Sequence, residues 1–223
     1  MKKFFIVLGS FLLLLVLSGV VFWNVRISES ITSESLDPFV YDSEKTTRGL
    51  IVDSLNGGLG FSGFGDVGDA TFFLNALIFH SIKSNVNEEY DPLNSECENE
   101  ACFYIVDESV FIVDYIFAES LDENILLTVS VKREGFPSLE TAVHLILDYN
   151  YEPSLLGGSI TFTILDISAG RQNLRTEHLS SLLESIGENE INEMISFGSF
   201  SIEELKLTIP LTEIMNSFFD SFF

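Results

Sequence analysis

The sequence predicts an α+β protein with an N-terminal transmembrane helix, followed by a curved antiparallel β-meander packed with helices. A bilayer-length apolar run opens the chain, alternating apolar and polar residues fill the middle, and helical periodicities flank that middle on both sides. A period of two is typical of a strand with one buried face, whereas apolar spacings of three and four are typical of an amphipathic helix. These three observations define the fold class.

The apolar run extends over 20 residues from Phe4 to Trp23, behind Lys2 and Lys3. A helix of this length spans roughly 30 Å, which is the thickness of the hydrocarbon core of a bilayer. The basic start favours a single-pass cell-membrane protein with its N-terminus inside and its domain outside. A cleaved signal peptide is the alternative, but its apolar region is normally about 7–15 residues long. We therefore expect an uncleaved anchor in the membrane.

Three regions follow from this organisation. Residues 1–26 form the cytoplasmic tip and the anchor, residues 27–47 a spacer rich in Ser, Thr and acids, and residues 48–223 one extracytoplasmic α+β domain. A segment with few apolar residues and many charges cannot bury enough surface to fold alone, which is why the second region is interpreted as a spacer.

The charge of the chain limits its partners. It has 34 acidic against 11 basic residues, a formal net charge of −23. Nucleic acids and anionic membrane surfaces bind basic patches, so the balance argues against both as direct partners. Solubility or a salty habitat accounts for the charge, with a cationic partner as the alternative.

Six glycines between Gly57 and Gly68 include Gly58-x-Gly60-x-x-Gly63, formally a dinucleotide-binding fingerprint. That fingerprint needs a strand before it and a helix that begins at its third glycine. Here the glycines simply continue, so we expect a flexible loop and no cofactor.

The only two cysteines, Cys97 and Cys102, enclose Glu98 and Glu100. Outside the cell a disulfide between them is chemically permitted, and two free thiols are the alternative. A zinc site needs further ligands, and no second pair of Cys or His lies close in the sequence, so no metal site is expected.

A helix is predicted from its N-cap Asp69 through Lys83, with Phe73, Leu77 and Ile78 on its buried stripe. Four strands are predicted to follow as a meander, at 108–120, 124–134, 140–152 and 160–169. The links "LDEN" and "GFPS" suit tight turns between antiparallel neighbours.

The fourth strand changes its buried phase. Ile160 and Phe162 alternate with polar residues up to Ile164, but the pattern resumes on the other phase after Leu165. Two adjacent apolar residues fit a β-bulge, or a strand that passes from one layer to another. Such a bend curves a sheet so that its concave face can wrap a helix or a ligand.

Beyond Gly170 the sequence predicts a helix with Thr176 as its N-cap, a short helix at 190–195 and a last strand at 201–209. Pro210 then opens a C-terminal helix. Its apolar stripe, which we expect to pack into the curved sheet or to lid it, comprises Ile214, Met215, Phe218, Phe219 and Phe222.

This order of elements resembles the YpmS-like family of membrane-anchored bacterial proteins over roughly residues 65–220. The resemblance is carried by "FLNALI", which contains Leu74-Asn75, by "DISAGRQNL", and by the following "HLSSLLESI". One departure is Arg175-Thr176, where the family pattern has a proline. The resemblance implies a membrane location and a curved sheet wrapped around a long helix, as in some lipid-binding proteins, but it implies no reaction.

No catalytic constellation is found in the sequence. His80, His144 and His178 are far apart, and His144 alternates onto the polar face of its strand. No nucleophile elbow, Ser-x-x-Lys or His-Glu-x-x-His occurs. We therefore expect no enzyme, and no ligand-binding residue can be assigned. Two functions remain: a binding module that shelters a lipid or another apolar ligand, or a non-catalytic structural or interaction protein that docks an envelope protein.

Overall fold

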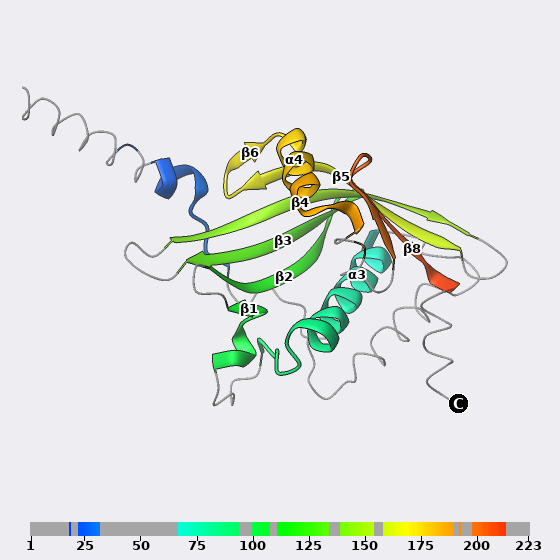
Figure 1. The fold of residues 1–223 in the computed structure, drawn as a ribbon, viewed down its shortest axis with the longest axis horizontal. Helices are drawn as coiled ribbons and strands as arrows, with labels where there is room; N and C mark the ends of the chain where they lie inside the picture. Colours follow the sequence, from blue (N-terminus) through cyan, green and yellow to red (C-terminus); the bar gives the residue numbers. More distant parts are fainter. Residues whose placement is uncertain are drawn as a thin grey trace, which may run out of the picture.

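The computed structural model describes residues 18, 22–31, 67–93, 100–107, 111–133, 139–153, 158–189, 192 and 198–212. Within these residues the chain is a mixed α+β protein with one curved antiparallel sheet, in the order β1-β2-β3-β4-β5-β8-β7, and β6 pairs with β5. Helix α3 lies against the concave side of the sheet and α4 against the opposite side (Figure 1). The predicted α+β class and the curved sheet are confirmed.

The predicted anchor falls mostly outside the described residues. Ser18 and Phe22 are helical, and Trp23–Ile27 forms one π-helical turn, η1. No helix of the described segments is long and apolar enough to cross a membrane.

The predicted meander is present, with a short strand β1 added before it. The strands are β1 (Val106–Asp107), β2 (Ile112–Leu121), β3 (Asn124–Arg133), β4 (Leu139–Glu152), β5 (Ser159–Ala169), β6 (Gln172–Leu174), β7 (Ser199–Ser201) and β8 (Lys206–Pro210). The predicted turn between β2 and β3 consists of two residues, and Asp122 has a φ of 52°. Asp tolerates this left-handed conformation because its short side chain bonds locally.

The predicted bulge in β5 is confirmed. Asp166 pairs with Ile146 and Ile164 with Leu147, so Leu165 has no partner in β4. Before Leu165 the other edge of β5 pairs with β8, and after it with β6. The extra residue therefore stands where the strand exchanges one neighbour for another, which bends the sheet.

The last strand, predicted at 201–209, is wrong as a single element. It is a hairpin of β7 and β8, whose turn contains Leu205 with a φ of 47°. Leu205 is only 7% exposed, because the turn itself packs into the protein.

Helix α3 extends over Val67–Ser81 and is followed by a π-helical turn, η3 (Ile82–Val86). It begins before Asp69, which lies in the first turn and is not the N-cap. The predicted one-sided stripe was too narrow, since the helix is buried on several faces. Its side chains that are at most 7% exposed are Ala70, Thr71, Phe73, Leu74, Asn75, Ala76, Leu77 and Phe79.

Helix α4 extends over Thr176–Ile186. The predicted N-cap Thr176 is wrong by one residue: the N-cap is Arg175, without a side-chain capping bond, and Thr176 is the first helical residue. The predicted helix at 190–195 lies outside the described residues except for Asn192, and so does the whole predicted C-terminal apolar stripe.

Asparagine side chains occupy both open edges of the sheet. Asn75 Nδ2 donates to Ala118 O of β2 at 2.8 Å, and Ala118 N donates to Asn75 Oδ1 at 2.7 Å. At the opposite edge, Asn192 Nδ2 donates to Phe200 O of β7 at 3.1 Å, and Phe200 N donates to Asn192 Oδ1 at 2.5 Å. A carboxamide has the donor and the acceptor of a peptide group, so each asparagine takes the place of a missing strand.

Asn75→Ala should lower the free energy of unfolding by roughly 2–4 kcal/mol, because the buried N–H and C=O of Ala118 lose their partners at about 1–3 kcal/mol each. Urea unfolding followed by circular dichroism measures the change. Asn173→Ala, at an exposed position of β6, is the control and should leave the midpoint unchanged. Equal midpoints for the two variants would contradict the role of Asn75.

Candidate functional site

Two rows of apolar side chains cross the concave face of the sheet. The register places one residue from each of β2, β3, β4 and β5 in each row. The rows are Ala118, Leu127, Leu145 and Ile167, and next to them Ile116, Val129, Val143 and Ala169. Because cross-strand neighbours on one face contact each other, these eight residues form two continuous strips, which we call the apolar rows.

The middle of the apolar rows (Leu127, Val129, Val143 and Leu145) is half-buried and less covered than the core beside it, whereas Ala118 and Ile167 in the first row are buried. Ile125, next to them on β3 and nearer its start, is fully buried, whereas Leu127 and Val129 are half-buried. Leu127 still packs against the core that α3 fills, but Val129 and Val143 are not part of that contact among the described residues. Burial of the concave face therefore decreases away from α3.

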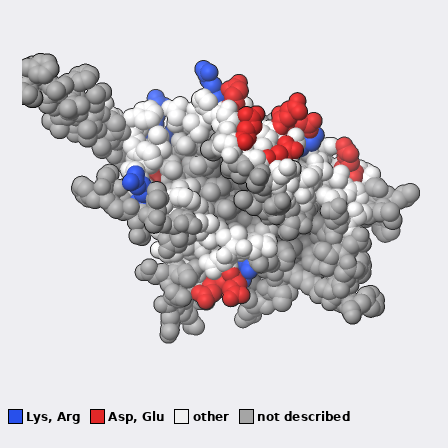
Figure 2. Space-filling model, viewed as in Figure 1, with Lys and Arg blue, Asp and Glu red and all other residues white. Residues whose placement is uncertain are grey.

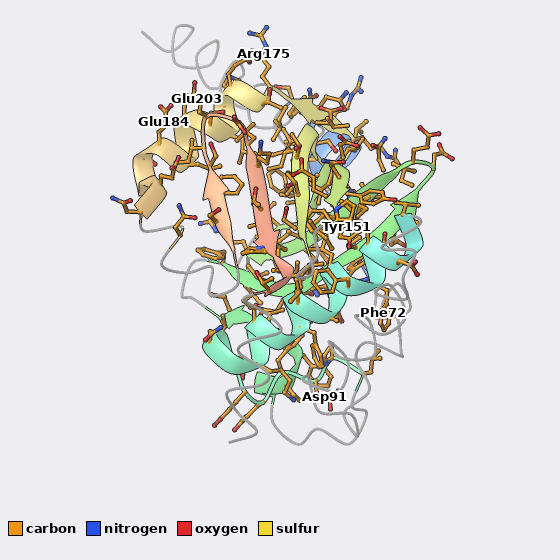
Figure 3. All side chains as sticks on the ribbon, turned by 90° about the vertical axis from the view of Figure 1, so that its right-hand side faces the viewer. Phe72, Asp91, Tyr151, Arg175, Glu184 and Glu203 are labelled. Atoms are coloured by element: carbon orange, nitrogen blue, oxygen red, sulfur yellow. The ribbon has the colours of Figure 1, made fainter. Side chains whose placement is uncertain are left out.

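The two faces of the sheet differ in chemistry. Figure 3 shows Tyr151, farther along the concave face, on the side of α3, and this residue packs against the core. Arg175, Glu184 and Glu203 lie on the other side, with α4 (Figure 3). The concave face is thus the apolar one.

Residues Arg26–Ile31, which we call the strap, dock at the start of β4, next to the second of the apolar rows. Thr141 Oγ1 donates to Ile27 O at 2.6 Å, and Glu29 N donates to Glu140 O at 3.3 Å. These bonds tie the strap to the start of β4, beyond the point where β5 ends.

The strap also contacts the turn between β5 and β6. Arg171 N donates to Arg26 O, and Gly170 N donates to Ala142 O, each at 2.7 Å. Gly170 has a φ of +53°, and a Cβ at this position would collide with Ile27 O. Glycine is therefore required at the end of the "DISAG" segment, because the strap passes directly over it.

The predicted spacer 27–47 needs a correction over its first residues. Residues 27–31 bond to the sheet and belong to the folded domain. The low hydrophobicity of the segment hid this, because the contacts are backbone hydrogen bonds that any composition can make. Residues 32–47 lie outside the described residues.

A chain of side-chain hydrogen bonds joins the strap to the convex face. Glu29 Oε2 lies 2.8 Å from His144 Nε2, and His144 Nδ1 lies 3.0 Å from Thr128 Oγ1. The order carboxylate, imidazole, hydroxyl is that of hydrolase triads. Thr128 is only 1% exposed, however, so its hydroxyl is covered. These three hydrogen-bonded side chains therefore act as a structural link between the strap and the sheet.

This link was missed in the sequence. The alternation of β3 and β4 predicts Thr128 and His144 on a solvated polar face; the face is right, but Thr128 is buried. Glu29 lies 115 positions from His144, and no spacing rule connects residues so far apart.

An ion pair between a buried aspartate and a half-buried lysine lies at a second bulge, in β2. Val113 pairs with Val131 and Tyr115 with Ser130, so Asp114 is the additional residue. The Asp114 side chain is 2% exposed, and its Oδ2 lies 2.5 Å from Lys132 Nζ. Oδ1 has no hydrogen-bond partner within the part of the chain that the structure describes.

The Asp114 carboxylate shifts the pKa values of two neighbouring side chains, Lys132 and Tyr115. Burial by itself lowers the pKa of Lys132, but the short contact with Asp114 and its negative charge outweigh burial, so that the pKa of Lys132 is raised. Burial raises the pKa of Tyr115, and the charge of Asp114 adds to the effect. At neutral pH, Lys132 is therefore a cation and Tyr115 an uncharged phenol.

Lys132→Met should lower the free energy of unfolding by about 3 kcal/mol, because it leaves the Asp114 carboxylate buried without a counter-charge. Arg133→Met removes the same charge from an exposed neighbour and should have little effect. A raised lysine pKa stabilises the fold below the ordinary lysine value, and this stabilisation is lost as the pH rises through the raised value. The difference between wild type and Lys132→Met, measured by urea unfolding, should accordingly shrink at strongly alkaline pH.

The other residues considered in the sequence do not converge. Cys102 is disulfide-bonded and 4% exposed, and Cys97, the only other cysteine, lies outside the described residues. His178 is exposed on α4, and the side chain of His80 lies outside the described part. Within the described ranges no three His, Cys, Asp or Glu side chains come close enough to hold a metal ion. The glycine-rich segment up to residue 66 is likewise not described.

Comparison of the chain with protein-family models, with curated proteins and with solved structures finds no match. The functional argument therefore depends on the geometry of this chain.

Proposed function

We propose that the protein is a membrane-anchored extracytoplasmic binding module that holds an apolar ligand, such as the acyl chain of a lipid, on the apolar rows. The observation that carries this proposal is the half-buried state of Leu127, Val129, Val143 and Leu145 on the concave face. Apolar area left partly in water favours burial by about 25 cal/mol per Å², so a flexible apolar chain gains by lying across the strips.

The position of the rows supports a lipid as the ligand. The strap docks at the same end of the sheet, and the apolar run Phe4–Trp23 precedes it in the sequence. With that run in a bilayer, the less covered end of the concave face lies toward the source of acyl chains. The resemblance to the YpmS-like family, which remains a prediction, points to the same location.

The second candidate is a non-catalytic structural or interaction protein of the cell envelope. It is favoured by α3, which already fills the inner part of the concave face, with Phe73 and Leu77 at most 1% exposed. Leu165 and Leu174, on neighbouring strands, are 51% and 38% exposed and would contact a protein partner.

Native mass spectrometry of the full chain, extracted from membranes in mild detergent, distinguishes the two functions. Lipid binding predicts a co-purified lipid that is lost in the Val129→Gln/Val143→Gln variant, because two amides on the concave face remove the apolar contact. Leu126→Gln, on the opposite face of β3, is the matched control and should retain the lipid. Wild-type protein without lipid, at a melting temperature equal to that of the variants, would favour the interaction protein.

The anchor has its own test. Cell fractionation and N-terminal sequencing should find the full chain in the membrane fraction, starting at its first residues, because the apolar run is of bilayer length and follows two lysines. A mature chain that begins near Val20 and is found free in the medium would refute it.

A further inference from the structure

The end of the sheet where the strap docks differs in charge from the rest of the chain. Arg26, Arg133 and Arg171 are all exposed there. Arg171 N bonds to Arg26 O, and Arg133 ends β3 beside the start of β4, to which the strap bonds. In Figure 2, several Lys and Arg atoms lie on the side toward the N-terminal turn, where little red is visible.

The three guanidinium groups are available for a ligand. Across the described residues none of them forms an ion pair with a carboxylate. Two acids described at this end have other partners: Glu29 contacts His144 at 2.8 Å, and Glu140 lies 3.6 Å from Lys132. Within the described part of a chain of net charge −23, this end therefore presents three arginines without an ion-pair partner.

Apolar side chains lie next to these arginines. Phe22, just before η1, and Val25, on η1, are 49% and 55% exposed. A surface that combines exposed arginines with an aromatic and an aliphatic side chain suits the boundary between lipid headgroups and acyl chains, where aromatic rings and basic residues are enriched.

We propose that this end of the domain rests on the headgroup layer of the membrane that anchors the chain, with Arg26, Arg133 and Arg171 contacting the phosphates of anionic phospholipids. Guanidinium binds phosphate with two parallel hydrogen bonds, which suits a lipid phosphate at a surface. The inference rests on the anchor of the proposed function.

The strap makes this orientation stable. A free spacer would let the domain tumble above the bilayer, but the strap bonds to β4 and to the turn between β5 and β6 directly after η1. The strap thereby holds the sheet with its arginine-bearing end toward the membrane, and the apolar rows lie beside the bilayer. An acyl chain then passes from the membrane onto Val129 and Val143 without crossing water.

The test uses the full chain in lipid nanodiscs, with a nitroxide attached to Asn173→Cys on β6 near the strap or to Glu152→Cys at the far end of β4. Cys102 is disulfide-bonded, so under non-reducing conditions the introduced thiol takes the label. In discs that contain phosphatidylglycerol, collision with a water-soluble nickel reagent should be several-fold lower at position 173 than at position 152. Equal collision rates at the two positions would overturn the proposal.

The contribution of the arginines is tested separately. Arg133→Glu/Arg171→Glu should raise the accessibility of position 173 to that of position 152, whereas Lys83→Glu/Lys206→Glu, the same change of charge elsewhere, should not. Protection that persists in the arginine variant and in purely zwitterionic discs would overturn the phosphate contacts. Failure of the chain to enter nanodiscs would refute the anchor, and loss of co-purified lipid with normal protection at position 173 would bear only on the apolar rows.

Discussion

The structure depends on how a curved, open sheet satisfies its two edges. This sheet bends around α3 without closing on itself, so its outer strands leave backbone N–H and C=O groups without a neighbouring strand. Asn75 and Asn192 provide these groups with carboxamide partners. The bond from Asn75 to Ala118 does more, because it fixes α3 against β2. Through that position it decides which part of the concave face is filled and which part stays half-covered.

The curvature itself depends on two bulges. The bulge at Leu165 lets β5 pair with β8 along its first half and with β6 along its second half. Asp114 in β2 introduces a buried carboxylate, which Lys132 compensates from the neighbouring strand. A bulge leaves one residue without a ladder partner, and the two sites resolve this differently: the leucine is left exposed, and the aspartate is paired.

The strap connects the architecture to the proposed function. It brings Glu29 to His144, makes Gly170 obligatory and gathers three exposed arginines at one end of an acidic protein. The net charge of the chain argued against an anionic surface as a partner. A sum over the chain, however, carries no information on where the charges lie. Recognition depends on the local field within about a Debye length, roughly 8–10 Å, and that field is set by the fold.

The sequence by itself determined the elements whose signal is local. Period-two alternation located the four strands of the meander, and the adjacent Ile164 and Leu165 located the bulge, because both features are written in neighbouring residues. The tertiary structure alone decided what depends on residues far apart: the partner of Asn75, the burial of Thr128, and the docking of the strap. Hydrogen bonds between residues more than 100 positions apart, such as Thr141 to Ile27 and His144 to Glu29, leave no periodic trace, since only the fold brings these residues together. The apolar rows lie between these cases, because alternation located the strands that carry them, and only the placement of α3 decided that Leu127, Val129, Val143 and Leu145 stay half-buried.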